Sequence, residues 1–184
     1  KGLDARLYHG IITSGAICYD ALKKGNHPYA KGSKALHLGE ERDQLILDST
    51  PYDITENVDE ADFIVCTNYV NDYPAILSKA VAKGLKMICV NPDMYVYAGV
   101  DKVRCSGFVA IEYKNLGGDV YYHGKPYPDI YENAISSLGV EKSKVAAIGD
   151  SLHTDIQGAC RAGIDSILIY GSGLYKLNKE NPTP

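Results

Sequence analysis

The sequence predicts an α/β fold in which a mainly parallel sheet is covered by helices on both faces. From about Ala61 onward, short apolar runs alternate with longer amphipathic segments, and this alternation is typical of strand–helix–strand units with right-handed crossovers. Glycine or proline stands at several expected helix ends, where these residues favour the end or the start of a helix. The 184 residues are 45% hydrophobic and 23% charged, which is the composition of a packed globular protein.

Each element expected after Ala61 has a local reason. Strands are expected where apolar residues run together, and helices where apolar residues recur on one face. Pro128 suits the first turn of one helix, and Gly84 suits the end of another. The expected strands are 62–67, 86–90, 119–122, 144–148 and 166–170, and the expected helices are 73–84, 106–116, 129–138 and a segment that carries Ile156, Ala159 and Cys160.

The first sixty residues give a less regular pattern. The segments 10–13 (GIIT) and 35–38 (ALHL) are expected to be strands, and 16–25 (AICYDALKKG) is expected to be a helix. The acidic segment 48–61 is rich in turn-forming residues, so we expect it to be a surface connection.

The charge distribution argues against nucleic-acid and membrane partners. The formal net charge is -4, from 19 basic and 23 acidic residues without a long block of either sign, whereas a nucleic-acid-binding surface needs clustered positive charge. The sequence has no apolar run of about 18 residues and no apolar signal-peptide region near its first residue. We therefore expect a cytoplasmic location.

The cysteines and histidines do not suggest disulfides or zinc. No two of the five cysteines are spaced as Cys-x-x-Cys, and the five histidines show no zinc-binding spacing. We therefore expect buried, reduced thiols at all five positions. They are Cys18, Cys66, Cys89, Cys105 and Cys160.

Three residues in the last third of the chain could carry chemistry. Open α/β sheets bind ligands at the carboxyl ends of their strands, and Asp150 and Lys125 each follow an expected strand. Gly149 would let a ligand approach the backbone. Asp155 stands near the start of the next helix, where a carboxylate can cap backbone N–H groups or orient its neighbours. Magnesium prefers carboxylate oxygens and takes one or two from the protein, so Asp150 is a candidate metal ligand.

Each of these residues also has an ordinary structural interpretation. A single aspartate after a strand is commonly a helix cap, and a lysine before a proline in a loop is commonly a surface residue. The combination of Lys125 and Asp150, separated by one helix and one strand, favours a functional site over two unrelated surface residues.

The order of three segments resembles the haloacid dehalogenase superfamily of phosphatases. These segments are NPD (91–93), GGDVYYHGKPYPDIYENAI (117–135) and VAAIGDSLHTDIQGACRAGIDSILI (145–169). The similarity is to subclass IIA, which includes N-acetylglucosamine-operon and pyridoxal-phosphate phosphatases. It implies a doubly wound, Rossmann-like core with an inserted α/β cap domain.

The resemblance also implies an activity and roles for the three candidate residues. The activity is magnesium-dependent hydrolysis of a small phosphorylated metabolite through an aspartyl-phosphate intermediate. Lys125 would neutralise the nucleophile and the transferring phosphoryl group, Asp150 would bind Mg²⁺, and Asp155 would support the site. The sequence itself leaves both a monomer and a homo-oligomer open.

Two motifs of the family have no counterpart in this sequence. Its members begin with a strand that carries Asp-x-Asp-Gly, whose first aspartate is the nucleophile, and a later strand supplies a Ser or Thr for the phosphate. Asp4 and Asp20 follow no apolar strand and belong to no Asp-x-Asp pair. Thr13 and Ser14 match the passage from the core into the cap. We therefore expect the nucleophile to lie upstream of this chain and the chain alone to be inactive.

The resemblance divides the chain into three parts. Residues 1–15 would be a core fragment that leads into the cap, 16–120 the α/β cap domain, and 121–184 the C-terminal part of the core. Asn91 and Asp93 would lie in the cap near the substrate, but the same residues also suit an ordinary turn.

Two other functions remain open from the sequence. One is a non-catalytic α/β binding module that uses the same scaffold. The other is a nucleotide- or sugar-binding doubly wound domain, which is disfavoured because neither Gly-x-Gly-x-x-Gly after a strand nor a P-loop is present.

Overall fold

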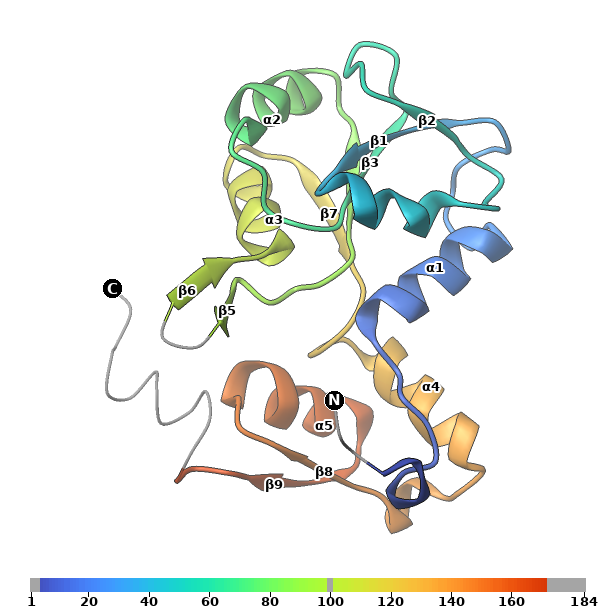
Figure 1. The fold of residues 1–184 in the computed structure, drawn as a ribbon, viewed down its shortest axis with the longest axis vertical. Coiled ribbons are helices and arrows are strands. Elements are labelled where there is room, and N and C mark those ends of the chain that lie inside the picture. Colours follow the sequence, from blue (N-terminus) through green and yellow to red (C-terminus); the bar gives the residue numbers. More distant parts are fainter. Residues whose placement is uncertain (1–3, 99–100, 172–184) are drawn as a thin grey trace. The chain divides into compact units, whose positions relative to one another are not determined.

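The computed structural model describes residues 4–98 and 101–171 and divides the chain into two compact units (Figure 1). Unit 2 is Ser14–Gly124, and unit 1 comprises the described residues of 1–13 and 125–184. The chain passes between the units after Thr13 and after Gly124, whereas the sequence-based borders stand at 15 and 120. That unit 2 is a cap stays a prediction.

Unit 2 is built on a five-stranded sheet in which every neighbouring pair is parallel. The strand order is β2-β1-β3-β4-β7. The expected α/β class with a mainly parallel sheet is therefore confirmed. The strands are β1 (Lys34–Leu38), β2 (Asp53–Thr55), β3 (Phe63–Cys66), β4 (Lys86–Cys89) and β7 (Asp119–Tyr122).

Helices cover both faces of this sheet. Successive strand residues point to opposite faces, so β3 packs its side chains against helices on both sides. Phe63 and Val65 of β3 belong to a buried cluster with Cys18 of α1, whereas Ile64 packs in a second cluster with Val109 of α3. Figure 1 shows α1 on one side of the sheet and α2 and α3 on the other. The helical elements are α1 (Ser14–Lys24), the 3-10 helix η2 (Glu41–Leu47), α2 (Tyr73–Ala82) and α3 (Ser106–Asn115).

The two ends of unit 2 lie side by side. A Cβ built on Gly124 would stand 2.6 Å from Cβ of Ser14 and 3.2 Å from Cδ of Pro92. Gly124 has a positive φ of 97°, so a side chain there would be strained as well as crowded.

Unit 1 contains a parallel pair of strands packed against helical segments. β8 (Ala146–Gly149) pairs with β9 (Asp165–Leu168), and α4 (Pro128–Leu138) begins at the proline expected in its first turn. The opposed residues Ile148 and Ile167 are 67% and 50% exposed. The remaining elements are η1 (Ala5–Leu7), η3 (Lys142–Lys144), the π-helical turn η4 (Leu152–Ile156) and α5 (Gln157–Ala162).

The described helices are short. α1 and α4, with 11 residues each, are the longest of them. None in the described part of the chain is long and apolar enough to cross a membrane.

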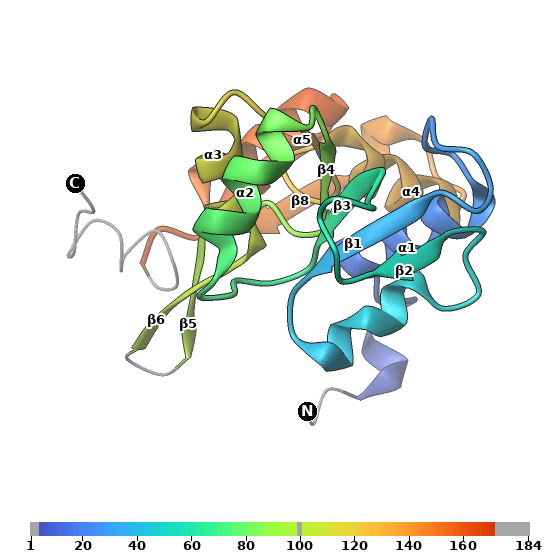
Figure 2. The ribbon, with the colours of Figure 1, turned by 90° about the horizontal axis from the view of Figure 1, so that it is seen from above.

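Two sequence expectations about secondary structure are wrong, and one hairpin was not expected. Residues 10–13 form no strand, because no neighbouring strand pairs with them among the described residues, and Ile11 is 74% exposed. The expected connection 48–61 contains β2, a three-residue strand that adds to the edge of the sheet beside β1. The antiparallel hairpin of β5 (Tyr95–Ala98) and β6 (Asp101–Arg104), which Figure 2 shows as a two-stranded ribbon, was not expected from the sequence.

The expectation of buried thiols is wrong at one position. The other four cysteines are buried, but Cys160 is exposed. It lies on α5 beside the buried Ala159, and successive helix residues do not share a face. Its apolar neighbour in sequence therefore gave the wrong indication of burial.

A pair of histidines is buried in unit 2. Nε2 of His27 and Nε2 of His123 are 3.2 Å apart. His27 is only 8% exposed and His123 only 3%. The ring of Tyr121 packs edge-on against both, with centroid distances of 5.2 and 5.0 Å. A hydrogen bond between two imidazoles requires one of these nitrogens to be unprotonated. Burial, together with His123, lowers the pKa of His27 to about 4.

We predict that unit 2 becomes less stable as the pH falls from about 6.5 towards 4. The pKa of His27 in the unfolded chain is about 6.5, so acid protonates the unfolded chain first. The neutral His27 therefore contributes its full stabilisation of the folded state above pH 6.5. As the pH falls from 6.5 to 4, the free energy of unfolding decreases by up to about 3 kcal/mol. Denaturant unfolding of the complete protein at pH 7 and pH 4.5 measures the loss.

Two histidine variants serve as controls for this prediction. His27→Gln removes the titration and should show a smaller loss of unfolding free energy between the two pH values. His153→Gln changes an exposed histidine of unit 1 and should behave as the wild type. Equal pH dependence in His27→Gln and the wild type would contradict the assignment.

Candidate active site

The carboxylate of Asp155 joins the three residues that the sequence singled out. Its Oδ1 lies 2.7 Å from Nζ of Lys125, and its Oδ2 accepts hydrogen bonds from the backbone N–H groups of Asp150 and Ser151, each at 3.1 Å. Asp155 is only 9% exposed. The structure therefore brings Lys125, Asp150 and Asp155 together at the carboxyl end of β8.

The π-helical turn η4 brings the Asp155 side chain back to the end of β8. The N–H groups of Asp155 and Ile156 both donate to the carbonyl oxygen of Ser151, at 3.0 and 3.1 Å. This wide turn places Asp155 so that its carboxylate faces the two N–H groups that follow the strand. Single π-helical turns occur frequently at functional sites.

Gly149 is required by the Asp155 side chain. A Cβ built on Gly149 would overlap the carboxyl carbon of Asp155. The space that the absent side chain of Gly149 leaves was expected to admit a ligand, and this is wrong because the Asp155 side chain fills that space. The absence of a side chain at Gly149 lets the Asp155 carboxylate approach the backbone at the end of β8.

Tyr131 of α4 supports the same turn, a role that the sequence pattern did not indicate. Its hydroxyl lies 3.0 Å from the carbonyl oxygen of Asp155 and 3.2 Å from that of Thr154, so it can donate to either. A Cβ on Gly158 would overlap the Tyr131 ring. Burial and the negative charge of Asp155 raise the pKa of Tyr131 to about 12, so its hydroxyl remains a donor at neutral pH.

The two side chains of the Lys125–Asp155 ion pair differ in solvent exposure. The Lys125 side chain is 43% exposed, whereas that of Asp155 is 12% exposed. The ammonium can therefore contact an anion while it remains next to Asp155. In the described part of the chain, no three His, Cys, Asp or Glu side chains gather as a metal-binding group.

The other residues singled out by the sequence lie in or next to unit 2. Oδ1 of Asn91 accepts a hydrogen bond from the N–H of Asp93 at 3.1 Å, which is the geometry of an Asx turn. Ser14 begins α1, and Thr13 immediately precedes that helix.

Comparison with known proteins places this geometry in a family. A family model described as HAD-hydrolase-like matches residues 122–182. A crystal structure of a haloacid dehalogenase-like hydrolase from Brucella suis 1330 is 32% identical, with a TM-score of 0.84 over 95% of this chain and 69% of that chain. The chain belongs to the haloacid dehalogenase-like family. The resemblance inferred from the sequence is thus confirmed.

Two curated relatives of this haloacid dehalogenase-like chain carry phosphatase names. The acid sugar phosphatase of Staphylococcus haemolyticus is 31% identical over 127 residues, which are 68% of this chain and 48% of that protein. The ribonucleotide monophosphatase NagD of Escherichia coli K12 is 31% identical over 104 residues, which are 56% of this chain and 40% of that protein. The chain thus spans less than half the length of each.

We predict that Gly149→Ala destabilises unit 1 of this haloacid dehalogenase-like protein. The added methyl group would push the Asp155 carboxylate away from the N–H groups of Asp150 and Ser151, and overpacking of this kind costs about 1–3 kcal/mol. Thermal unfolding measures the effect. Gly10→Ala is the matched control, because a Cβ there meets no atom within 4 Å. Equal melting temperatures for the two variants would contradict the role given to Gly149.

Proposed function

We propose that the complete protein containing this chain is a magnesium-dependent phosphatase that hydrolyses small phosphomonoesters. The observation that carries the proposal is the Asp155 carboxylate, which holds the Lys125 ammonium and the backbone of Asp150 at one strand end. A cation and a carboxylate at that position suit the binding of a metal-bound phosphoryl group. The phosphatase names of the two curated relatives support this reaction class.

The carboxylates of this chain suit one part of a magnesium site. Both oxygens of Asp155 accept hydrogen bonds from Lys125 and the backbone, so they are poorly placed to bind a cation as well. The ligand role therefore falls to Asp150, which directly follows β8 and is half-buried. Magnesium needs only one or two protein carboxylates because water and substrate phosphate complete its shell. When bound, it would offset negative charge on the phosphoryl oxygens.

Lys125 would act on the same phosphoryl group from this chain. Its ammonium is fixed by Asp155 yet 43% exposed, so it can approach an anionic oxygen without moving far. A preorganised positive charge stabilises the transition state most where negative charge develops. Asp155 acts through Lys125 and through the backbone, and is therefore a positioning residue.

The nucleophile proposed for this reaction lies outside the 184 residues. The sequence contains no Asp-x-Asp pair. The phosphoryl group would pass to an aspartate supplied elsewhere in the complete protein, with cleavage of the ester bond and protonation of the leaving oxygen. Water would then hydrolyse the aspartyl phosphate and restore the carboxylate. The exposed Ile148 and Ile167 support the proposal that β8 and β9 belong to a larger sheet.

We predict that Asp150→Asn in the complete protein weakens magnesium binding and slows hydrolysis, while the fold persists. The amide keeps the shape of the side chain but removes the anionic ligand. Hydrolysis of p-nitrophenyl phosphate as a function of magnesium concentration measures the change. Asp155→Asn should affect thermal stability more and magnesium dependence less.

Asp165→Asn is the matched control for the metal assignment, because Asp165 is an exposed residue of β9. It should leave the magnesium dependence as in the wild type. An unchanged magnesium dependence in Asp150→Asn would show that Asp150 is not the ligand. Absence of hydrolysis by the wild-type complete protein, with magnesium and a panel of phosphomonoesters, would favour a non-catalytic binding module.

We predict that Lys125→Ala lowers the turnover number of the complete protein by about a hundredfold or more, by comparison with the loss of one preorganised electrostatic donor. Lys125→Arg should restore only part of the activity, because a planar guanidinium differs in shape from an ammonium. Steady-state kinetics at saturating substrate provide the measurement. Lys144→Ala removes an exposed lysine of unit 1 and should retain wild-type turnover. Wild-type turnover in Lys125→Ala would remove Lys125 from the site.

A further inference from the structure

One short segment, residues 125–131, holds Asp155 at two points. Nζ of Lys125 lies 2.7 Å from the carboxylate oxygen Oδ1 of Asp155, and the hydroxyl of Tyr131 lies 3.0 Å from its main-chain carbonyl oxygen. The first contact restrains the Asp155 side chain, and the second restrains its backbone. All three residues belong to unit 1. The segment therefore influences both where Asp155 lies and how its carboxylate is oriented.

The backbone between these two contacts has little freedom. Pro126 and Pro128 each have a backbone φ that their rings restrict. Tyr131 lies in the first turn of α4, which begins at Pro128. The Lys125 ammonium and the Tyr131 hydroxyl therefore approach Asp155 from one restricted segment and not from two independent loops.

The Tyr131 ring is restrained by α5. A Cβ built on Gly158 would overlap Cε2 and the hydroxyl oxygen of Tyr131, so the ring occupies the space that the absent side chain leaves. Gly158 is itself buried. The hydroxyl is therefore directed at η4 by packing as well as by its hydrogen bond, and a phenylalanine at position 131 would keep the packing of the ring.

The hydroxyl acts on a turn whose geometry is uncommon. The carbonyl oxygens of Thr154 and Asp155, at 3.2 and 3.0 Å from it, are consecutive in the π-helical turn η4, and π-helical turns are rare in proteins. Loss of the hydroxyl would remove a donor from these partly buried carbonyl groups, which is unfavourable. The turn could then relax, and the Asp155 carboxylate would move with it.

We propose that Tyr131 is a positioning residue for the reaction: its hydroxyl holds η4 so that the Asp155 carboxylate places the Lys125 ammonium at the phosphoryl group. This inference rests on the proposed function and adds a residue that would touch neither the substrate nor the metal. A charge that stabilises a transition state must be held close to its productive position, because small displacements cost much of its effect. Tyr131 supplies that restraint from the backbone side of Asp155.

A double-mutant cycle in the complete protein tests whether Tyr131 acts through Lys125. Tyr131→Phe keeps the ring and removes only the hydroxyl. It should lower the turnover number for p-nitrophenyl phosphate about tenfold and leave KM nearly unchanged, because a displaced charge stabilises the transition state less. In the Lys125→Ala background the same substitution should have a much smaller effect on turnover, because the charge that the hydroxyl positions is absent.

Acetylation of Lys125 by acetic anhydride, followed by mass spectrometry, measures the positioning without using activity. The amine can attack the reagent only after its nitrogen leaves the hydrogen bond to Asp155. Lys125 should therefore be acetylated several times faster in Tyr131→Phe than in the wild type. Lys144, an exposed lysine of unit 1, should react equally fast in both. Tyr121→Phe is the matched control, because Tyr121 is 55% exposed and lies in unit 2, and it should retain the wild-type acetylation rate and turnover.

The two measurements separate this inference from the proposed function. If Tyr131→Phe lowered turnover by the same factor with and without Lys125, the hydroxyl would have a general structural role and the inference would be overturned. An unchanged acetylation rate at Lys125 in Tyr131→Phe would overturn it as well, whether or not the protein hydrolyses phosphomonoesters. Absence of hydrolysis by the wild type would overturn the proposed function, and faster acetylation of Lys125 in Tyr131→Phe would then still support the restraint of the ammonium by the hydroxyl.

Discussion

The arrangement of unit 1 depends on where one buried carboxylate is held. Asp155 is 9% exposed, and an unpaired charge at that depth would be costly. The Lys125 ammonium and the N–H groups of Asp150 and Ser151 compensate it. This requirement accounts for the glycine at 149, for the wide turn η4 and for the tyrosine that supports the turn from α4. The candidate site is therefore also a folding constraint of the unit.

The parts of the fold that were predictable from sequence are those with local and periodic signals. β3 and residues 87–89 of β4 are continuous apolar runs because both faces of the sheet are covered. α4 begins at Pro128 and ends before Gly139, whose φ is 63°. Lys125 and Asp150 could be singled out because each follows a strand. Their contact through Asp155 could not be derived, because it depends on a turn geometry that the spacing of two aspartates does not specify.

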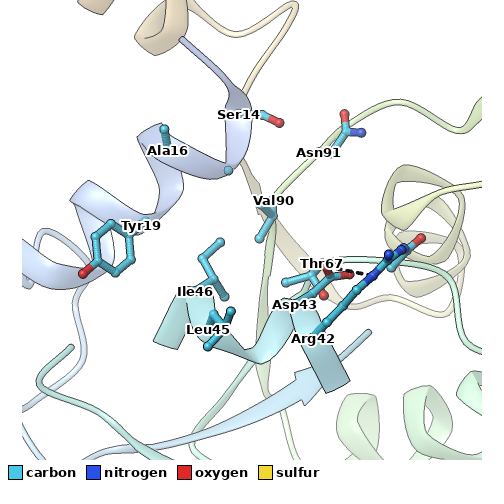
Figure 3. A pocket seen from close by; sticks show the side chains of 12 residues that line it. Ser14, Ala16, Tyr19, Arg42, Asp43, Leu45, Ile46, Thr67, Val90 and Asn91 are labelled. Carbon is cyan, nitrogen blue, oxygen red and sulfur yellow. Dashed lines mark ion pairs between the residues drawn. The ribbon is translucent and has the colours of Figure 1, made fainter. Parts of the chain in front are cut away.

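The expectations that failed depended on partners elsewhere in the chain. Residues 10–13 are as apolar as a strand but pair with no strand among the described residues, while the polar β2 forms a strand because β1 offers it an edge. Tyr131 lies in the expected helix 129–138, but the acceptors of its hydroxyl are carbonyl oxygens more than 20 residues further along the chain. The hollow in unit 2 that Tyr19, Ile46, Thr67 and Asn91 help to line (Figure 3) combines residues from four separate segments, so only the three-dimensional arrangement reveals it.

The closeness of Ser14 and Gly124 has a consequence for how such a protein can change. Because the two ends of unit 2 are neighbours, a chain that omitted the whole unit would need only a tight turn to close the gap, and closing a short gap costs little conformational entropy. Insertions with adjacent ends are tolerated in domains for the same reason. Unit 2 can therefore be exchanged as a module with its own strand order.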